Sequence, residues 1–294
     1  MTATARVRRL VLILLAAYVG IVVLLLVFEK RLIFFPQIPG RLSGDWSPRD
    51  LAEEEVWLTA ADGVRLHAWW IPARADRGQA DVPTILCFHG NAANIAWRAD
   101  VYRFLRDLPA NVLALEYRGY GKSEGSPSEA GLYRDADAAY DYLVHERSLA
   151  PRRVIALGQS LGTAVAAELA ARRELGGIVL EAPFPSAREV ARRIYWFLPG
   201  LPWLVRSRFE TTKNLELANR KFGAPVLVMH CTRDPVIPFA FGRQVYDRAP
   251  QPKSFAAIAG ECHEEATLID PGTVRQEFLK FLEQVRESHP PVPQ

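Results

Sequence analysis

A serine stands between two glycines at residues 158–162, where the chain reads Gly-Gln-Ser-Leu-Gly. The apolar run before it, residues 154–157, predicts a buried strand, and the residues after it carry a helical pattern. A serine on such a sharp strand-to-helix turn presents its hydroxyl at the end of a sheet, and Gly158 and Gly162 would let the two backbones pass close to the turn. This arrangement predicts that Ser160 is a nucleophile. The alternative is an ordinary glycine-containing turn that happens to hold a serine.

A serine hydroxyl becomes a good nucleophile when a base accepts its proton, and that base is usually a histidine oriented by a carboxylate. Asp234 lies in a proline-rich turn after the apolar run 225–229, and His263 follows the last predicted strand. The chain order nucleophile, acid, histidine suits a nucleophile on a strand-to-helix turn. Asp234 could instead cap the helix that follows it. Glu181, after the preceding strand, is the alternative acid.

The reaction of such a serine also needs hydrogen-bond donors for a developing oxyanion. The backbone N–H of Leu161, next to the serine at the start of a helix, is one candidate. The second candidate is the backbone N–H of Asn91, in the loop after the predicted strand 84–88. Gly90 in that loop would let the backbone approach a substrate. We expect His89, which precedes this glycine, to have a structural role.

Short apolar runs alternate with helical patterns from residue 55 onward. Two segments of alternating polarity around Asp62-Gly63 predict a hairpin. Its strands are residues 56–59 and 64–70. Further strands are predicted at residues 84–88, 112–115, 154–157, 178–180, 225–229 and 254–258, and helices at about residues 95–108, 128–147, 161–174, 238–248 and 273–287. Continuous apolar strands separated by helices are typical of an α/β fold with a mostly parallel sheet covered on both faces.

The interval of residues 184–222 is longer than a simple crossover between strands and contains a cluster of aromatic residues. Long insertions at the strand ends of such a sheet often form a lid over the site. The alternative, which is compatible with a lid, is an amphipathic helix pair packed on the core. We expect residues 1–31 to form a membrane anchor, 32–54 a linker, 55–287 one α/β domain that includes this cap insertion, and 288–294 a disordered tail.

Five motifs occur in an order that resembles the α/β-hydrolase superfamily. They are His89-Gly90-Asn91, the glycine-rich segment 117–125, the serine turn, the stretch from His230 to Asp234, and the stretch from Gly260 to His263. With its apolar N-terminal segment the chain is similar to the membrane-anchored serine hydrolases of that superfamily. The resemblance covers about residues 55–285. It implies a Ser160–Asp234–His263 triad and an eight-stranded, mostly parallel sheet with helices on both faces and a short helical cap.

The chain has three cysteines, Cys87, Cys231 and Cys262, at spacings typical of neither a disulfide framework nor a zinc site. Cys87 lies in an apolar run and is most simply a small buried hydrophobic residue. If Asp234 contacts His263, as the resemblance implies, then Cys231 and Cys262 come from adjacent loops. A disulfide that links the acid loop to the base loop is then a hypothesis, and it would suit an oxidising compartment.

Residues 10–28 carry no charge and read LVLILLAAYVGIVVLLLVF. As a helix this segment is about 28 Å long, which is enough to cross the hydrocarbon core of a bilayer. A cleaved signal peptide is the alternative, but residues 29–36 contain no small-residue cleavage site. Three arginines precede the segment. One such segment predicts a single-pass protein. The positive-inside rule favours a cytoplasmic N-terminus, with the domain on the opposite side.

Composition and motifs together narrow the function. The 294 residues carry a net charge of only +3 and their arginines are scattered, which does not indicate nucleic-acid binding. No metal and no organic cofactor is implied. We predict a serine hydrolase that cleaves a carboxylic ester or thioester, with a small-molecule, acyl or lipid-like substrate. An amide or peptide hydrolase with the same triad is the alternative, and a catalytically silent membrane scaffold is the third possibility.

Overall fold

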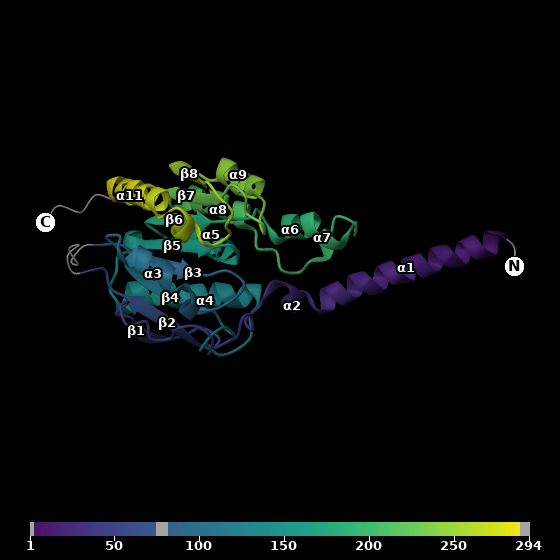
Figure 1. The fold of residues 1–294 in the computed structure, drawn as a ribbon, viewed down its shortest axis with the longest axis horizontal. Helices are drawn as coiled ribbons and strands as arrows, with labels where there is room; N and C mark the ends of the chain where they lie inside the picture. Colours follow the sequence, from purple (N-terminus) through teal and green to yellow (C-terminus); the bar gives the residue numbers. More distant parts are fainter. Residues whose placement is uncertain (1–2, 75–81, 289–294) are drawn as a thin grey trace.

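One sheet forms the centre of the computed structural model, which describes residues 3–74 and 82–288 (Figure 1). Its eight strands lie in the order β1-β2-β4-β3-β5-β6-β7-β8. The strands are β1 (Glu54–Thr59), β2 (Arg65–Ile71), β3 (Thr84–Phe88), β4 (Asn111–Leu115), β5 (Val154–Gln159), β6 (Gly177–Glu181), β7 (Val226–Cys231) and β8 (Lys253–Ile258). Only the pairings of β2, with β1 and with β4, are antiparallel. The predicted eight-stranded, mostly parallel sheet with its front hairpin is confirmed.

Helices cover both faces of this sheet. The long helices of the domain are α3 (Ala99–Arg106), α4 (Glu129–Asp141), α5 (Leu161–Arg172), α8 (Thr211–Lys221), α9 (Phe239–Arg248) and α11 (Pro271–Ser288), with the short α10 (Ala266–Ile269) before the last. Buried side chains of α4, α5, α8 and α9 share one core cluster, and those of α3, α10 and α11 share the other. Strand β3 contributes alternately to the two clusters, because successive side chains of a strand point to opposite faces.

The interval 184–222 contains two different structures. Helices α6 (Ala187–Ile194) and α7 (Leu201–Leu204) project from the body (Figure 1). Helix α8 instead packs against α5 and α9 and connects to β7 as a layer helix of the domain. We predicted one cap insertion for this interval. An amphipathic helix that covers a sheet and one that covers a cavity have the same sequence pattern, so α8 could not be separated from the cap.

The N-terminal helix α1 (Ala3–Val27) extends away from the domain, and a short helix α2 (Glu29–Ile33) follows it (Figure 1). In the described part of the chain, α1 is the one helix long and apolar enough to cross a membrane. The residues after α2 lie against the domain, since Arg41 donates to the carbonyl of Gly121 and Asn94 donates to the carbonyls of Arg41 and Ser43. The tail expected from residue 288 falls, beyond Ser288, outside the described residues.

Candidate active site

Ser160 occupies the turn between β5 and α5 with a backbone conformation that few non-glycine residues adopt, φ 48° and ψ −112°. A Cβ on Gly158 would lie 2.3 Å from the carbonyl oxygen of Gly162, and a Cβ on Gly162 would lie 2.0 Å from that of Phe88. Both glycines are therefore required by the close approach of the backbones. Strain of this kind persists where the surrounding structure over-determines it. The turn holds the serine side chain at the end of the sheet.

Two loops at this end of the sheet bring His263 and Asp234 to the serine. Nε2 of His263 lies 2.8 Å from Oγ of Ser160, and Nδ1 lies 2.7 Å from Oδ2 of Asp234. The other oxygen of Asp234 accepts hydrogen bonds from the backbone amides of Val236 and Ile237, both at 2.8 Å. The Asp234 side chain is fully buried and that of His263 is 15% exposed. His263 thus lies within hydrogen-bonding distance of both Ser160 and Asp234, the other two residues selected from the sequence.

The surroundings of this pair set its proton affinities. Burial raises the pKa of Asp234, but hydrogen bonds from His230 and His263 outweigh it and hold the pKa well below its usual 3.8. Burial lowers the pKa of His263, but the hydrogen bond to Asp234 and the charge of Glu264 outweigh it, so this pKa lies above 6.5. The carboxylate is therefore ionised at neutral pH, and the imidazole is able to accept a proton there.

His230 is a second histidine beside Asp234, and no role for it was predicted from the sequence. It is fully buried at the end of β7, with Nε2 3.3 Å from Oδ2 of Asp234 and 2.9 Å from the carbonyl oxygen of Ile237. A Cβ on Gly242 would lie 2.2 Å from its Nδ1, so α9 packs directly on the ring. His230 thus lies beside the same oxygen of Asp234 that His263 contacts. The sequence feature that could have indicated this contact is the position of His230, four residues before Asp234.

Glu181, the alternative acid, has other partners. It is buried at the end of β6, where one oxygen accepts from Nε2 of Gln159 at 2.8 Å and the other accepts from the backbone amide of Ala266 at 3.0 Å. Burial raises the pKa of Glu181 to about 7. Its carboxyl group braces the loop that follows His263. Among the described residues, the carboxylate within hydrogen-bonding distance of Nδ1 of His263 belongs to Asp234.

The expected oxyanion donors flank the serine. Leu161 is the first residue of α5, where backbone amides have no acceptor within the helix. The Asn91 peptide is held on both sides, because its carbonyl accepts from Phe35 N and Tyr120 Oη, each at 2.9 Å, and its Nδ2 donates to the carbonyl of Ile33 at 3.1 Å. Both Leu161 and Asn91 line the same cavity as Ser160.

A partly buried ion pair holds the Asn91 loop against the histidine loop. The guanidinium of Arg98 lies 2.7 Å from Oε2 of Glu264 and also donates to the carbonyls of Ala92 and Asn94. The other oxygen of Glu264 stands where a Cβ of Gly90 would lie, only 1.7 Å away. Gly90 therefore makes room for this carboxylate. No pattern in the sequence pairs Arg98 with Glu264, which are 166 positions apart.

An apolar cavity of about 350 Å³ begins at Ser160. Its walls come from three regions of the chain: the end of α1 with α2, the cap helices α6 and α7, and the loop after Asp234. Phe184 and Phe209 are buried where the cap joins the domain, and both line the cavity. The cavity has the size of a ligand pocket and the character of one that holds an apolar group.

A profile of the alpha/beta hydrolase family matches residues 85–269, which include the serine turn, both loops and the cap. The chain belongs to this family. As a family member it is 34% identical over 287 residues to the alpha/beta hydrolase domain-containing protein WAV2 of Arabidopsis thaliana, an alignment that covers 89% of this chain and 90% of WAV2. It is 31% identical to the lysophosphatidylserine lipase ABHD12 of Danio rerio, over 85% of this chain and 74% of that protein.

Solved structures show the same hydrolase fold. The esterase Pf2001 of Pyrococcus furiosus superposes with a TM-score of 0.64 over 86% of this chain and 97% of its own, at 23% identity. An alpha-beta hydrolase from Vibrio vulnificus superposes with a TM-score of 0.63 over 78% of this chain and 81% of its own. At these identities the likeness concerns the fold alone.

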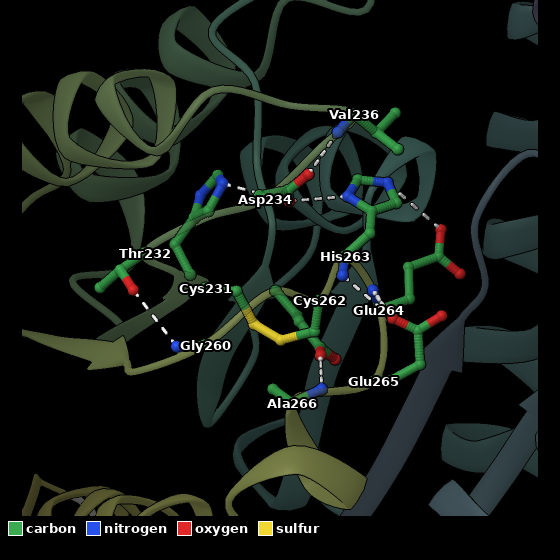
Figure 2. The surroundings of a disulfide bond; sticks show 12 residues. Cys231, Thr232, Asp234, Val236, Gly260, Cys262, His263, Glu264, Glu265 and Ala266 are labelled. Atoms are coloured by element: carbon green, nitrogen blue, oxygen red, sulfur yellow. Dashed lines mark hydrogen bonds and ion pairs between the residues drawn. A yellow bond between two sulfur atoms is a disulfide. The ribbon is translucent and has the colours of Figure 1, made fainter.

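A disulfide between Cys231 and Cys262 joins the two loops of the hydrolase site, as the sequence hypothesis proposed (Figure 2). Cys231 ends β7 before the Asp234 loop, and Cys262 directly precedes His263. Backbone hydrogen bonds join the same loops: Thr232 N donates to Ile258 O at 2.8 Å, and Arg233 N donates to Gly260 O at 3.0 Å. The disulfide therefore joins the loop that carries His263 covalently to the loop that carries Asp234. Cys87, the remaining cysteine, is free and buried.

Proposed function

We propose that the chain is a membrane-anchored serine hydrolase that cleaves a carboxylic ester or thioester through an acyl-enzyme on Ser160. One observation carries the proposal: Ser160 Oγ, the His263 ring and the Asp234 carboxylate form a continuous hydrogen-bonded chain with separations of 2.8 and 2.7 Å. A serine activated in this way needs only a bound carbonyl and an oxyanion site to react. In the described chain, Ser160 lines a cavity that Leu161 and Asn91, the expected oxyanion donors, also line.

In the first half of the reaction, Oγ of Ser160 attacks the carbonyl carbon and its proton passes to Nε2 of His263. Asp234 holds the ring so that Nε2 faces the serine, and its negative charge stabilises the imidazolium. The backbone amides of Leu161 and Asn91 bind the negative oxygen. The carbon–oxygen or carbon–sulfur bond to the leaving group then breaks, and that group takes the proton from Nε2. The product is an ester between the acyl group and Ser160.

In the second half, a water molecule attacks the acyl-enzyme and gives a proton to Nε2 of His263. The bond between the acyl carbon and Oγ breaks, and Ser160 regains its proton from the imidazolium. A carboxylic acid leaves. Each step uses the same three side chains and the same two amides, and the enzyme returns to its starting state.

The apolar cavity favours a substrate with a hydrocarbon chain. Most of its lining side chains are apolar, such as Val190, Leu201 and Phe209. The similarity to the lysophosphatidylserine lipase ABHD12 supports a lipid-like substrate, and the esterase fold of Pf2001 is compatible with ester hydrolysis. An amide or peptide hydrolase would use the same triad and is the alternative that the substrate panel must distinguish.

A substrate panel tests the proposal. Purified full-length protein in detergent is assayed with p-nitrophenyl esters from acetate to palmitate, with the matching acyl thioesters, and with aminoacyl anilides. We expect turnover of the esters, the highest kcat/KM at an intermediate or long chain, and none above background for Ser160→Ala. Faster cleavage of the anilides than of the esters would favour the amide hydrolase. No turnover of any substrate by the wild-type protein would favour the silent scaffold.

A further inference from the structure

The tip of the cap, residues 194–204, exposes a concentration of large apolar side chains. Trp196 is 77% exposed and Trp203 63%. Ile194, Phe197 and Leu204 are also more than half exposed. The cap projects from the body in the same direction as α1 (Figure 1). Apolar surface of this kind marks a contact with a membrane or with another protein.

The tip packs against α1. Leu198 and Leu201 share a small buried cluster with Val22, and the hydroxyl of Tyr18 donates to the carbonyl of Pro199. Tyr18 lies about 15 Å along the helix from the domain-side end of the uncharged segment 10–28. That length equals about half of a hydrocarbon core roughly 30 Å thick. The tip therefore reaches to the depth of one leaflet beside a helix long and apolar enough to span both.

Several backbone groups of the tip have hydrogen-bond partners within the protein or need none. Pro199 and Pro202 have no N–H to satisfy, and the Pro199 carbonyl has a partner in Tyr18. Leu198 N donates to the Tyr195 carbonyl at 2.9 Å, and Trp203 N donates to the Gly200 carbonyl at 3.1 Å. Backbone groups within a bilayer must be satisfied in this way.

Positive charge flanks the tip on both sides. Residues 187–208 contain five arginines and one acid, Glu189. Three arginines precede the tip on α6 and two follow it, at positions 188, 192, 193, 206 and 208. The guanidinium of Arg188 lies 4.5 Å from the centre of a ring of Trp203. Arginines next to exposed tryptophans are typical of the boundary between headgroups and hydrocarbon.

The residues that follow the tip and lead back to the domain are bound to the start of α2. The carboxylate of Glu29, at the start of α2, accepts from the backbone amides of Arg206 and Ser207 at 3.0 and 2.7 Å. The cavity from Ser160 lies between the same two elements, with Leu25 and Leu26 of α1 on one wall and Ile194 and Leu201 of the cap on the other. An apolar chain in this cavity would touch the anchor and the cap at once.

We propose that the tip 194–204 inserts into the domain-facing leaflet beside α1, and that a lipid acyl chain enters the cavity from this leaflet between α1 and the cap. The insertion of the tip does not depend on the proposed hydrolysis. The entry of a chain deepens the proposed function and rests on it.

Depth-dependent fluorescence quenching tests the insertion. Full-length protein is reconstituted into phosphatidylcholine vesicles whose acyl chains carry bromine at defined depths. We expect strong quenching in the wild-type protein, and loss of most of it in Trp196→Phe/Trp203→Phe. The matched control Trp57→Phe/Trp97→Phe, at exposed tryptophans of the domain (44% and 53%), should keep the wild-type quenching. Equal quenching of the tip variant and the wild-type protein would overturn the insertion, and so would tryptophans that the bromine does not quench.

Photo-crosslinking tests the entry without catalysis. Ser160→Ala protein in vesicles is irradiated with a fatty acid that carries a diazirine near the end of its chain. We expect adducts on the peptides that contain Phe184 and Phe209, because these buried residues line the cavity. Adducts confined to α1 and the cap tip, with none on Phe184 or Phe209, would overturn entry from the leaflet. Both results are independent of turnover, so a failure of the proposed hydrolysis would be recognised separately in the substrate panel.

Discussion

At the scale of single residues, the Asp234–His263 pair decides how the site should respond to pH. In the proposed mechanism the neutral imidazole is the base. Burial lowers the pKa of His263, but the hydrogen bond to Asp234 and the charge of Glu264 outweigh it, so the pKa lies above 6.5. We expect kcat/KM for a short ester to rise with pH through this pKa and then to level off. A rate that falls as pH rises from 6 to 8 would contradict this role.

Substitution of the two acids separates their roles. Asp234→Asn should lower kcat on the order of 10³–10⁴-fold, because the neutral amide no longer stabilises the imidazolium or its orientation. Glu181→Gln keeps only one of the two acceptor oxygens that bind Gln159 and Ala266, but it leaves Asp234 and His263 in place, so it should lower kcat much less than Asp234→Asn. Steady-state kinetics of both variants with one short ester measure the difference. Nearly intact turnover in Asp234→Asn, with loss in Glu181→Gln, would assign the acid to Glu181.

Glu181 should also leave a signature in stability. Burial raises its pKa to about 7 in the folded protein, above its usual 4.5. Folding therefore favours the protonated form, so the contribution of Glu181 is most favourable below about pH 4.5, declines as pH rises towards 7, and is constant above that. The size is about 1.4 kcal/mol for each unit of the shift. Denaturant unfolding across this range should show a smaller decline in Glu181→Gln than in wild type, and identical pH dependence would contradict the raised pKa.

At the scale of elements, the Cys231–Cys262 disulfide connects the end of β7 to the loop after β8, and the loops after these two strands carry Asp234 and His263 (Figure 2). The two cysteines are 31 positions apart, and closing a loop of that length stabilises the folded state by roughly 3–4 kcal/mol. We expect Cys231→Ser/Cys262→Ser to lower the free energy of unfolding by about this amount and to reduce kcat. Cys87→Ser is the matched control, because its thiol is buried without a disulfide partner.

Mass spectrometry of the intact protein checks the bond itself. Alkylation under denaturing conditions should modify one cysteine before reduction and three after it. Three modified cysteines without reduction would show that the disulfide does not form.

The sequence was sufficient for the elements with a simple pattern. Strands such as β3 and β5 are uninterrupted apolar runs, because helices cover both of their faces. The serine turn was recognisable because its chemistry is local. The division between the cap and α8 was not, since both parts of 184–222 are amphipathic. The supports of the site were also missed: His230 and the Arg98–Glu264 pair act through contacts that only the folded chain creates.

At the scale of the whole molecule, the charges around the N-terminal helix and the disulfide of the site favour the same placement of the domain. Three arginines before residue 10 favour a cytoplasmic N-terminus, and we propose that the domain lies on the opposite side of the membrane. The disulfide agrees with that placement, because such bonds persist in oxidising compartments. An N-terminal epitope should become accessible to antibody only after the cells are permeabilised, and a C-terminal epitope should be accessible on intact cells. The reverse pattern would contradict this topology.

The central claim is that Ser160 is an activated nucleophile, and covalent labelling tests it most directly. Full-length protein in its membrane is treated with a fluorophosphonate probe, and the labelled peptide is identified by mass spectrometry. We predict one adduct on Ser160, slower labelling of Asp234→Asn and His263→Ala, and none of Ser160→Ala. A wild-type protein that does not label, or a Ser160→Ala variant that labels equally, would contradict the account.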